Sequence, residues 1–188
     1  MTAFHPALTG TPVLETERLR LRAPAPADID AWATYKASQR SRFTGGVQER
    51  PQAWRGFCGI IGHWAVRGYG MFVLTRHGSD AALGLVGPWF PDGWPGQEIG
   101  WMLFDASLEG QGLAREAALA ARTHAYDALG WSTAISLIDP GNTPSEALAR
   151  RLGCAVEGTA ELPGVGPTRV WRHPGPDALS EGGMEAYA

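Results

Sequence analysis

The sequence is poor in cysteine and has no long run of apolar residues. Of its 188 residues only two are cysteines, Cys58 and Cys154, and they form no CxxC pair. Disulfide frameworks and zinc sites need more cysteines at closer spacing, so no metal is expected and both thiols are predicted to be buried small side chains. No apolar run approaches the roughly 18 residues of a membrane span, and the first residues lack the basic and apolar regions of a signal peptide. We therefore expect a soluble, cytoplasmic protein that has no membrane partner.

The chain also lacks a surplus of positive charge. It has 16 Lys and Arg against 19 Asp and Glu, which gives a formal net charge of −3 at pH 7. Because non-specific binding to nucleic acid depends on positive charge, no nucleic-acid partner is expected. Apolar residues make up 44% of the chain, enough for the core of one compact domain. We expect that domain to cover residues 1–173 and a Pro/Gly/acidic tail to follow over 174–188.

What the sequence does contain is a regular order of strand-like and helix-like segments. The patterns predict strands at 14–22, 71–75, 83–90, 97–104, 133–138, 154–162 and 168–174, and helices at 28–38, 51–66, 112–129 and 143–152. In the last helix Thr143 is the expected N-cap, with Pro144 at the first helical position and Glu146 closing a capping box. This order predicts an α/β arrangement around one mixed sheet.

A glycine-rich turn, "EGQGLA" (109–114), stands between a predicted strand and a long predicted helix. It is not a P-loop, which needs GxxxxGK[ST], and Arg115 occupies the place of the small sixth residue of a Rossmann turn. Free backbone N–H groups at the start of a helix still favour phosphate, and Gly110 and Gly112 would let it approach closely. The alternative is an ordinary turn that only reverses the chain.

The same stretch resembles the glycine motif of the GCN5-related N-acetyltransferases (GNAT), written (Q/R)xxGx(G/A). Gly112 and Ala114 occupy its fourth and sixth positions, whereas Glu109 stands where Gln or Arg is usual. Five further segments appear in the family's order, so the chain resembles the RimJ/RimL-like branch over residues 14–174: "HWAVRGYGMFVL", "GWPGQEIGW", "EIGWML", "NTPSEALARRLG" and "VWRHP".

The resemblance implies a fold and a co-substrate. The fold would be a mixed, mostly antiparallel twisted sheet of about seven strands with about four flanking helices and a splayed V between two central strands. Acetyl-CoA would be the co-substrate. Its pyrophosphate would lie on the amides of the glycine turn and its pantetheine arm along the edge of the strand before it. The implied CoA-binding residues are Trp101, Met102, Leu103, Phe104, Gly110, Gln111, Gly112, Leu113, Ala114, Arg115, Asn142 and Ser145.

Two residues are candidates for catalysis of direct acetyl transfer to a primary amine. Glu98 could take the proton that an ammonium must lose before it attacks, or it could be a structural carboxylate. Ser145 could donate a hydrogen bond to the departing thiolate, as in similar enzymes, or it could simply start a helix. Trp89, Trp94 and Trp101 could wall an acceptor pocket or fill space.

The implied acceptor is a protein N-terminus or a small amine, and homodimer formation is left open. A non-catalytic CoA-binding sensor with the same fold and a nucleotide-binding module without acetyl chemistry are the alternatives.

Overall fold

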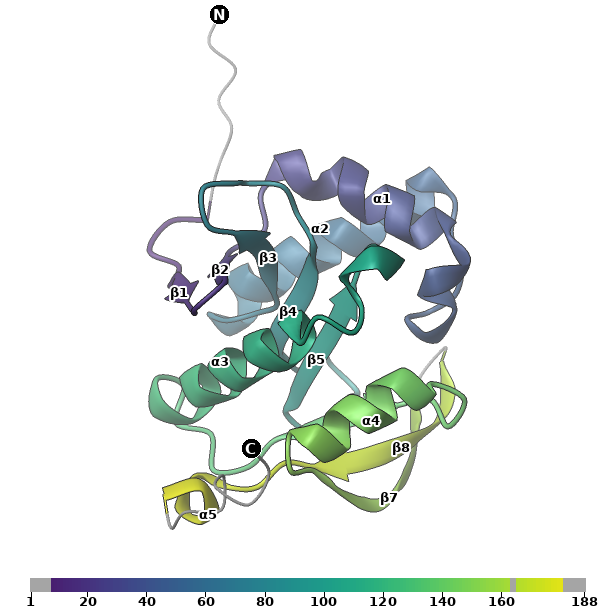
Figure 1. Cartoon of the computed structure of the whole chain (residues 1–188). Coiled ribbons are helices and arrows are strands. Elements are labelled where there is room, and N and C mark those ends of the chain that lie inside the picture. Colours follow the sequence, from purple (N-terminus) through teal and green to yellow (C-terminus); the bar gives the residue numbers. More distant parts are fainter. Residues whose placement is uncertain (1–7, 163–164, 181–188) are drawn as a thin grey trace, which may run out of the picture.

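The computed structural model describes residues 8–162 and 165–180, which fold around one sheet (Figure 1). Its strands are β1 (Leu14–Glu15), β2 (Leu19–Arg22), β3 (Phe72–Arg76), β4 (Gly84–Trp89), β5 (Glu98–Leu103), β6 (Ile135–Ile138), β7 (Ala155–Leu162) and β8 (Gly166–Arg172). Its α-helices are α1 (Ile29–Ala37), α2 (Arg50–Arg67), α3 (Leu113–Asp127), α4 (Thr143–Arg151) and α5 (Pro176–Ser180). Short 3₁₀ helices cover Pro26–Asp28, Gln39–Phe43 and Ala106–Leu108.

The sheet is buried between two layers of helices because alternate strand residues point to opposite faces. On one face Val73 and Leu85 pack in a cluster with side chains of α1 and α2. On the other face Phe72 and Val86 pack in a cluster with a row of buried alanines from α3. In Figure 1, α3 lies in front of the sheet and α2 behind it. The period-2 alternation of the apolar strands thus supplies two cores.

The strands follow the order β1-β2-β3-β4-β5-β6-β8-β7, and their pairing changes at the centre. Every neighbouring pair is antiparallel except β5 and β6, which run parallel. Among the described residues a single residue pair, Glu98 with Ile135, joins these two strands. Beyond it β5 and β6 diverge, which gives the splayed V.

The predicted fold class is confirmed, with four local differences. The segment predicted as one strand over 14–22 is instead a hairpin, in which Leu14 of β1 pairs with Leu21 of β2. The 3₁₀ helix Gln39–Phe43 has no counterpart in the prediction. The N-cap of α4 is Asn142, whose Oδ1 accepts from the Ser145 amide at 3.4 Å, so the predicted cap at Thr143 was wrong by one residue. Glu146 closes no capping box and pairs with Arg150 and Arg169 instead.

Three further expectations concern the surface and the chain ends. Cys154 is buried as predicted, whereas Cys58 is exposed on α2, so that prediction was wrong. Helix α5 lies in the predicted tail, and residues 181–188 of that tail fall outside the described part of the chain. Within the described ranges no helix combines the length and apolar character needed to cross a membrane.

Candidate active site

Two adjoining cavities lie where β5 and β6 diverge. The larger, about 630 Å³, is lined by the glycine turn and the start of α4; the smaller, about 320 Å³, extends between α1, β5, β6 and the β7–β8 hairpin. Both are lined by Phe43, Thr44, Trp101, Met102, Asn142 and Ser145. Because these six residues line both, the two cavities are neighbours; the larger is the polar arm of the site and the smaller is its aromatic arm.

Most of the residues predicted to bind CoA line the larger cavity. It contains all of them except Phe104 and Gln111. The Phe104 ring stacks on Tyr35 at a centroid distance of 5.1 Å, and the Gln111 side chain donates to the Ser107 carbonyl at 2.6 Å. Glu98 lines the smaller cavity, as Ser145 also does, so both predicted catalytic residues are in the wall of one cavity.

The glycine turn holds an unusual backbone shape that leaves helix amides free. Gly110 and Gly112 have φ of +73° and +75°, the left-handed region that favours glycine. The first bond of α3 runs from the Glu116 amide to the Gly112 carbonyl, at 3.0 Å, so the preceding amides have no partner within the helix. Arg18 fixes the turn from outside, donating to the Gln111 carbonyl at 2.8 Å and to Glu116 Oε2 at 2.6 Å.

Arginines surround this turn, and one of them explains the departure at Glu109. Arg40 donates to Glu109 Oε1 at 2.7 Å and to the Leu103 carbonyl at 3.2 Å. A guanidinium from the 3₁₀ helix therefore neutralises the carboxylate at the motif's first position. The arginines that line the cavity are Arg40, Arg42, Arg115 and Arg151. Sequence patterns missed Arg40 and Arg42 because "QRSRF" has no periodicity; its only signal is local basic charge.

Side chains replace one rung of the ladder at the point where β5 and β6 separate. The Ile135 amide donates to the Gln97 carbonyl at 2.9 Å, and the next parallel rung would join the Leu137 amide to the Ile99 carbonyl. Instead, Ser136 Oγ donates to the Ile99 carbonyl at 2.7 Å. The Leu137 amide donates to Glu98 Oε1 at 3.3 Å. Both backbone groups are thus satisfied without closing the V.

The strand alternation decides which backbone groups of β5 face the gap. The Gln97 and Ile99 carbonyls point toward β6, so Trp101 and Leu103 direct their backbone groups the same way. Met102 and Phe104 point toward β4, where the Phe104 amide donates to the Leu83 carbonyl at 2.9 Å. Of the four predicted strand positions, Trp101 and Leu103 therefore offer main-chain bonds to a ligand in the V.

Glu98 is a buried carboxyl held between two donors. Its Oε2 accepts from Trp94 Nε1 at 2.6 Å, and its Oε1 accepts from the Leu137 amide. Burial raises the pKa of Glu98 to about 7, and these two hydrogen bonds oppose the rise. A carboxyl with that pKa exchanges a proton readily near neutral pH.

A buried chain of hydrogen bonds supports Ser136. Because its hydroxyl donates to a carbonyl, Ser136 Oγ must accept from His173 Nε2, which lies at 2.9 Å. His173 Nδ1 then accepts from Arg122 Nη1 at 3.4 Å. Burial, followed by the charges of Arg122 and Arg172, lowers the pKa of His173 to about 3, so the ring is neutral. This chain fixes Ser136 at the separation point.

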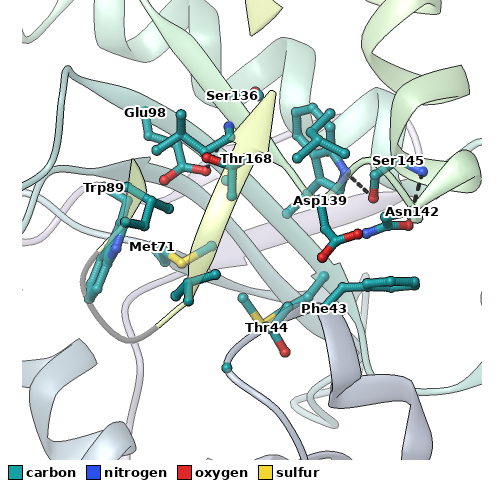
Figure 2. Close-up of a pocket in the computed structure, with 18 of the residues that line it drawn as sticks. Phe43, Thr44, Met71, Trp89, Glu98, Ser136, Asp139, Asn142, Ser145 and Thr168 are labelled. Carbon is teal, nitrogen blue, oxygen red and sulfur yellow. Dashed lines mark hydrogen bonds between the residues drawn. The ribbon is translucent and has the colours of Figure 1, made fainter. Parts of the chain in front are cut away.

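The start of α4 faces β5 across the V. Trp101 Nε1 donates to Ser145 Oγ at 3.2 Å, which leaves the Ser145 hydroxyl hydrogen available to another acceptor. Figure 2 shows Ser145 and Asn142 together on one side of the cavity and Glu98 and Ser136 on another. Trp89, Trp94 and Trp101 all line the aromatic arm, so they do not only fill space in the core; that the arm takes the acceptor stays a prediction.

Comparison with known proteins identifies the family. Residues 18–155 match the family described as the acetyltransferase (GNAT) domain, so the chain belongs to the GNAT acetyltransferases. A solved acetyltransferase from Agrobacterium tumefaciens strain C58 is 32% identical with a TM-score of 0.80, covering 92% of this chain and 99% of that one.

Two more distant structures share the fold. RimL, a ribosomal L7/L12 α-N-protein acetyltransferase in complex with coenzyme A, is 19% identical with a TM-score of 0.68 over 86% of this chain and 97% of its own. Mycobacterium smegmatis RimJ, in complex with CoA-disulfide, is also 19% identical, with a TM-score of 0.67 over 90% and 88% of the two chains.

In the part of the chain that the structure describes, no group of three or more His, Cys, Asp or Glu side chains could hold a metal ion.

Proposed function

We propose that the chain is an acetyl-CoA-dependent N-acetyltransferase that passes the acetyl group directly to a primary amine. The observation that carries this proposal is the junction of the two cavities. Free helix amides and arginines line the larger cavity, and at the V it adjoins the smaller cavity, an aromatic chamber that contains a carboxyl with a raised pKa. A thioester and an amine could meet at that junction.

In this proposal the larger cavity takes acetyl-CoA as a substrate. The amides at the start of α3 receive the pyrophosphate, and the arginines around the turn balance its charge. The pantetheine arm lies along the free edge of β5, bonded to the backbone groups of Trp101 and Leu103. Asn142 has its Oδ1 engaged in capping α4, so its amide nitrogen is the atom left for the arm.

The proposed reaction is a single transfer without an acetylated enzyme. The amine lone pair attacks the thioester carbonyl carbon, the new C–N bond forms, and the C–S bond breaks as CoA thiolate leaves. Glu98 accepts the proton that the amine loses, directly or through water. Ser145 keeps its proton and donates a hydrogen bond to the thiolate sulfur, at a helix start that favours negative charge.

The experiment is an acceptor screen followed by thiol release. RimL is described as acting on the α-amine of a ribosomal protein, so the panel should contain peptides with free N-termini as well as small amines. We expect thiol release that depends on the acceptor, with an acetylated product detected by mass spectrometry. Tight CoA binding without any acetylated product would contradict the proposal and favour the sensor.

A further inference from the structure

The chain contains a single lysine, Lys36, and it lies in the wall of the aromatic chamber. Sixteen residues are Lys or Arg, and all but this one are arginines. The Lys36 side chain belongs to α1 and lines the smaller cavity, yet the residue is only 1% exposed. Lysine is almost never buried to this extent without a partner. The burial of Lys36 therefore indicates a specific role at the cavity wall.

Known contacts satisfy only part of this amine. Nζ donates to the Thr44 carbonyl at 2.6 Å and lies 5.6 Å from the centre of the Trp32 ring. An ammonium has three hydrogens to donate. None of the ion pairs among the described residues involves Lys36. Its positive charge thus has a ring and a carbonyl beside it but no counter-ion.

Anchoring the loop after α1 does not account for the charge. The Lys36 carbonyl already accepts from the Gln48 amide at 2.9 Å and the Ser41 carbonyl accepts from the Gly46 amide at 3.1 Å, so main-chain bonds hold this loop. A neutral donor would serve the Thr44 carbonyl as well. Burial lowers the pKa of the Lys36 amine to about 8, which still leaves most of it charged at neutral pH. A buried cation is costly unless an anion pairs with it.

Two carboxyl groups, Glu98 and Asp139, line the chamber together with Lys36, and Asp139 Oδ1 already accepts from the Gly141 amide at 2.7 Å. Glu98 comes from β5, whereas Lys36 Nζ is held beside Thr44, and Figure 2 shows Glu98 and Thr44 well apart across the drawn side chains. Aromatic and thioether side chains, among them Trp89, Trp94 and Met71, line the same cavity. Its volume, about 320 Å³, suits a small molecule or one terminal residue of a peptide.

We propose that Lys36 binds a carboxylate of the acceptor, so that the acceptor is an amino acid or a peptide whose amine is accompanied by an acid. This inference rests on the proposed function and adds the substrate class. The carboxylate supplies the missing counter-ion of Lys36, while the amine of the same molecule is directed toward Glu98 and the thioester. Aromatic walls exclude water and strengthen the ion pair.

The first test compares acceptors that differ only in charge. The first pair consists of two peptide amides with N-terminal Glu or Gln, which differ in a side-chain carboxylate. The second pair consists of 4-aminobutyrate and 4-aminobutyramide, which differ in the carboxylate of a small molecule. In each pair the reacting amine is nearly unchanged. We expect kcat/KM to favour the acid by about tenfold or more in at least one pair, chiefly through KM. The pair that shows the preference distinguishes a peptide acceptor from a free amino acid.

Variants then assign the preference to one residue. Lys36→Met should reduce the acid-to-amide ratio to near unity, and Lys36→Arg should restore part of it. Arg50→Met removes a positive charge from the neighbouring helix α2, where Arg50 is 65% exposed and pairs with Asp30, and it should leave the ratio unchanged. A preference that survives in Lys36→Met, or the absence of any preference in the wild type, would overturn the inference.

A measurement on the wild type avoids the risk that a variant fails to fold. Protein labelled with ¹³C-lysine gives one set of lysine signals, because only Lys36 contributes. Its Cε resonance should move when 4-aminobutyrate is added and stay in place with the amide. An acetyl group found on Lys36 itself after incubation with acetyl-CoA would make it an acceptor and contradict the counter-ion role. If no amine of any kind is acetylated, the proposed function fails and this inference falls with it; equal use of acid and amide contradicts the inference alone.

Discussion

At the residue scale, Glu98 combines a structural contact with a property that suits catalysis. Its Oε1 accepts a hydrogen bond from the Leu137 amide where the ladder ends, which is a structural role. Its raised pKa suits proton transfer. The sequence placed an acid at the start of a strand and left both readings open. The sequence could not reveal that Trp94 donates to Glu98, or that side chains replace the main-chain bond between the Leu137 amide and the Ile99 carbonyl. Both features depend on how far β6 diverges from β5.

The test of Glu98 must remove the proton acceptor without creating a clash. In Glu98→Gln the new NH₂ group would face a donor on either side, from Trp94 or from Leu137. Trp94→Phe removes one donor, so the informative comparison is Trp94→Phe against Trp94→Phe/Glu98→Gln. If Glu98 is the base, the double variant should lose about 100-fold in kcat/KM at pH 7, with partial recovery at high pH as the free amine becomes abundant. Equal pH–rate profiles would exclude Glu98 as the base.

Ser145 offers a smaller effect that separates chemistry from binding. Its hydroxyl accepts from Trp101 and keeps one hydrogen to donate. Ser145→Ala should lower kcat by about tenfold with little change in CoA affinity, because the bond forms only as the thiolate develops. Steady-state kinetics and calorimetric titration of CoA are the measurements. Unchanged kcat would leave Ser145 as a residue of the α4 N-terminus alone.

At the scale of elements, the sequence predicted long periodic segments well and a short basic segment not at all. Helix α3 and its preceding turn follow from glycine, alanine and apolar spacing, which are local properties. The 3₁₀ helix Gln39–Phe43 has no such pattern, and its position depends on Arg40 reaching Glu109 and the Leu103 carbonyl far along the chain. Long-range polar contacts of this kind leave no local signal.

The glycine turn can be tested with a matched pair of variants that differ only in charge. Asp and Asn tolerate left-handed backbone better than most side chains, so Gly112→Asp and Gly112→Asn carry similar strain. A β-carbon there would lie 3.4 Å from Arg18 Nη2, so both new side chains meet the same guanidinium, and only Asp adds negative charge at the helix start that a phosphate would occupy. We expect CoA to bind the Asp variant about tenfold more weakly than the Asn variant, or about 1.4 kcal/mol by calorimetry. Equal affinities would contradict a phosphate site at this turn.

At the scale of the whole molecule, two buried titratable groups, Glu98 and His173, affect the stability of the fold in opposite ways as the pH changes. Because the pKa of His173 is depressed, the folded state favours the neutral ring. The folded state therefore loses stability as the pH falls below 6.5, the usual pKa of histidine. Glu98 has a raised pKa, so the folded state holds its proton and loses stability as the pH rises from 4.5 to about 7. The sequence predicted the V through its family resemblance, but not these pKa shifts, since they arise from burial and from contacts, such as that of Ser136 with His173, that form only in the folded sheet.

The two effects oppose each other between about pH 4.5 and 6.5, each with a slope of about 1.4 kcal/mol per pH unit. Removing Glu98 therefore exposes the acid sensitivity that His173 causes. Relative to Trp94→Phe, the free energy of unfolding of Trp94→Phe/Glu98→Gln should increase with pH, by about 3 kcal/mol between pH 4.5 and 7. Urea denaturation of both variants at several pH values measures this difference. Parallel curves would mean that Glu98 is already ionised in the folded protein at pH 5, in which case it could not act as a base with a pKa near neutrality.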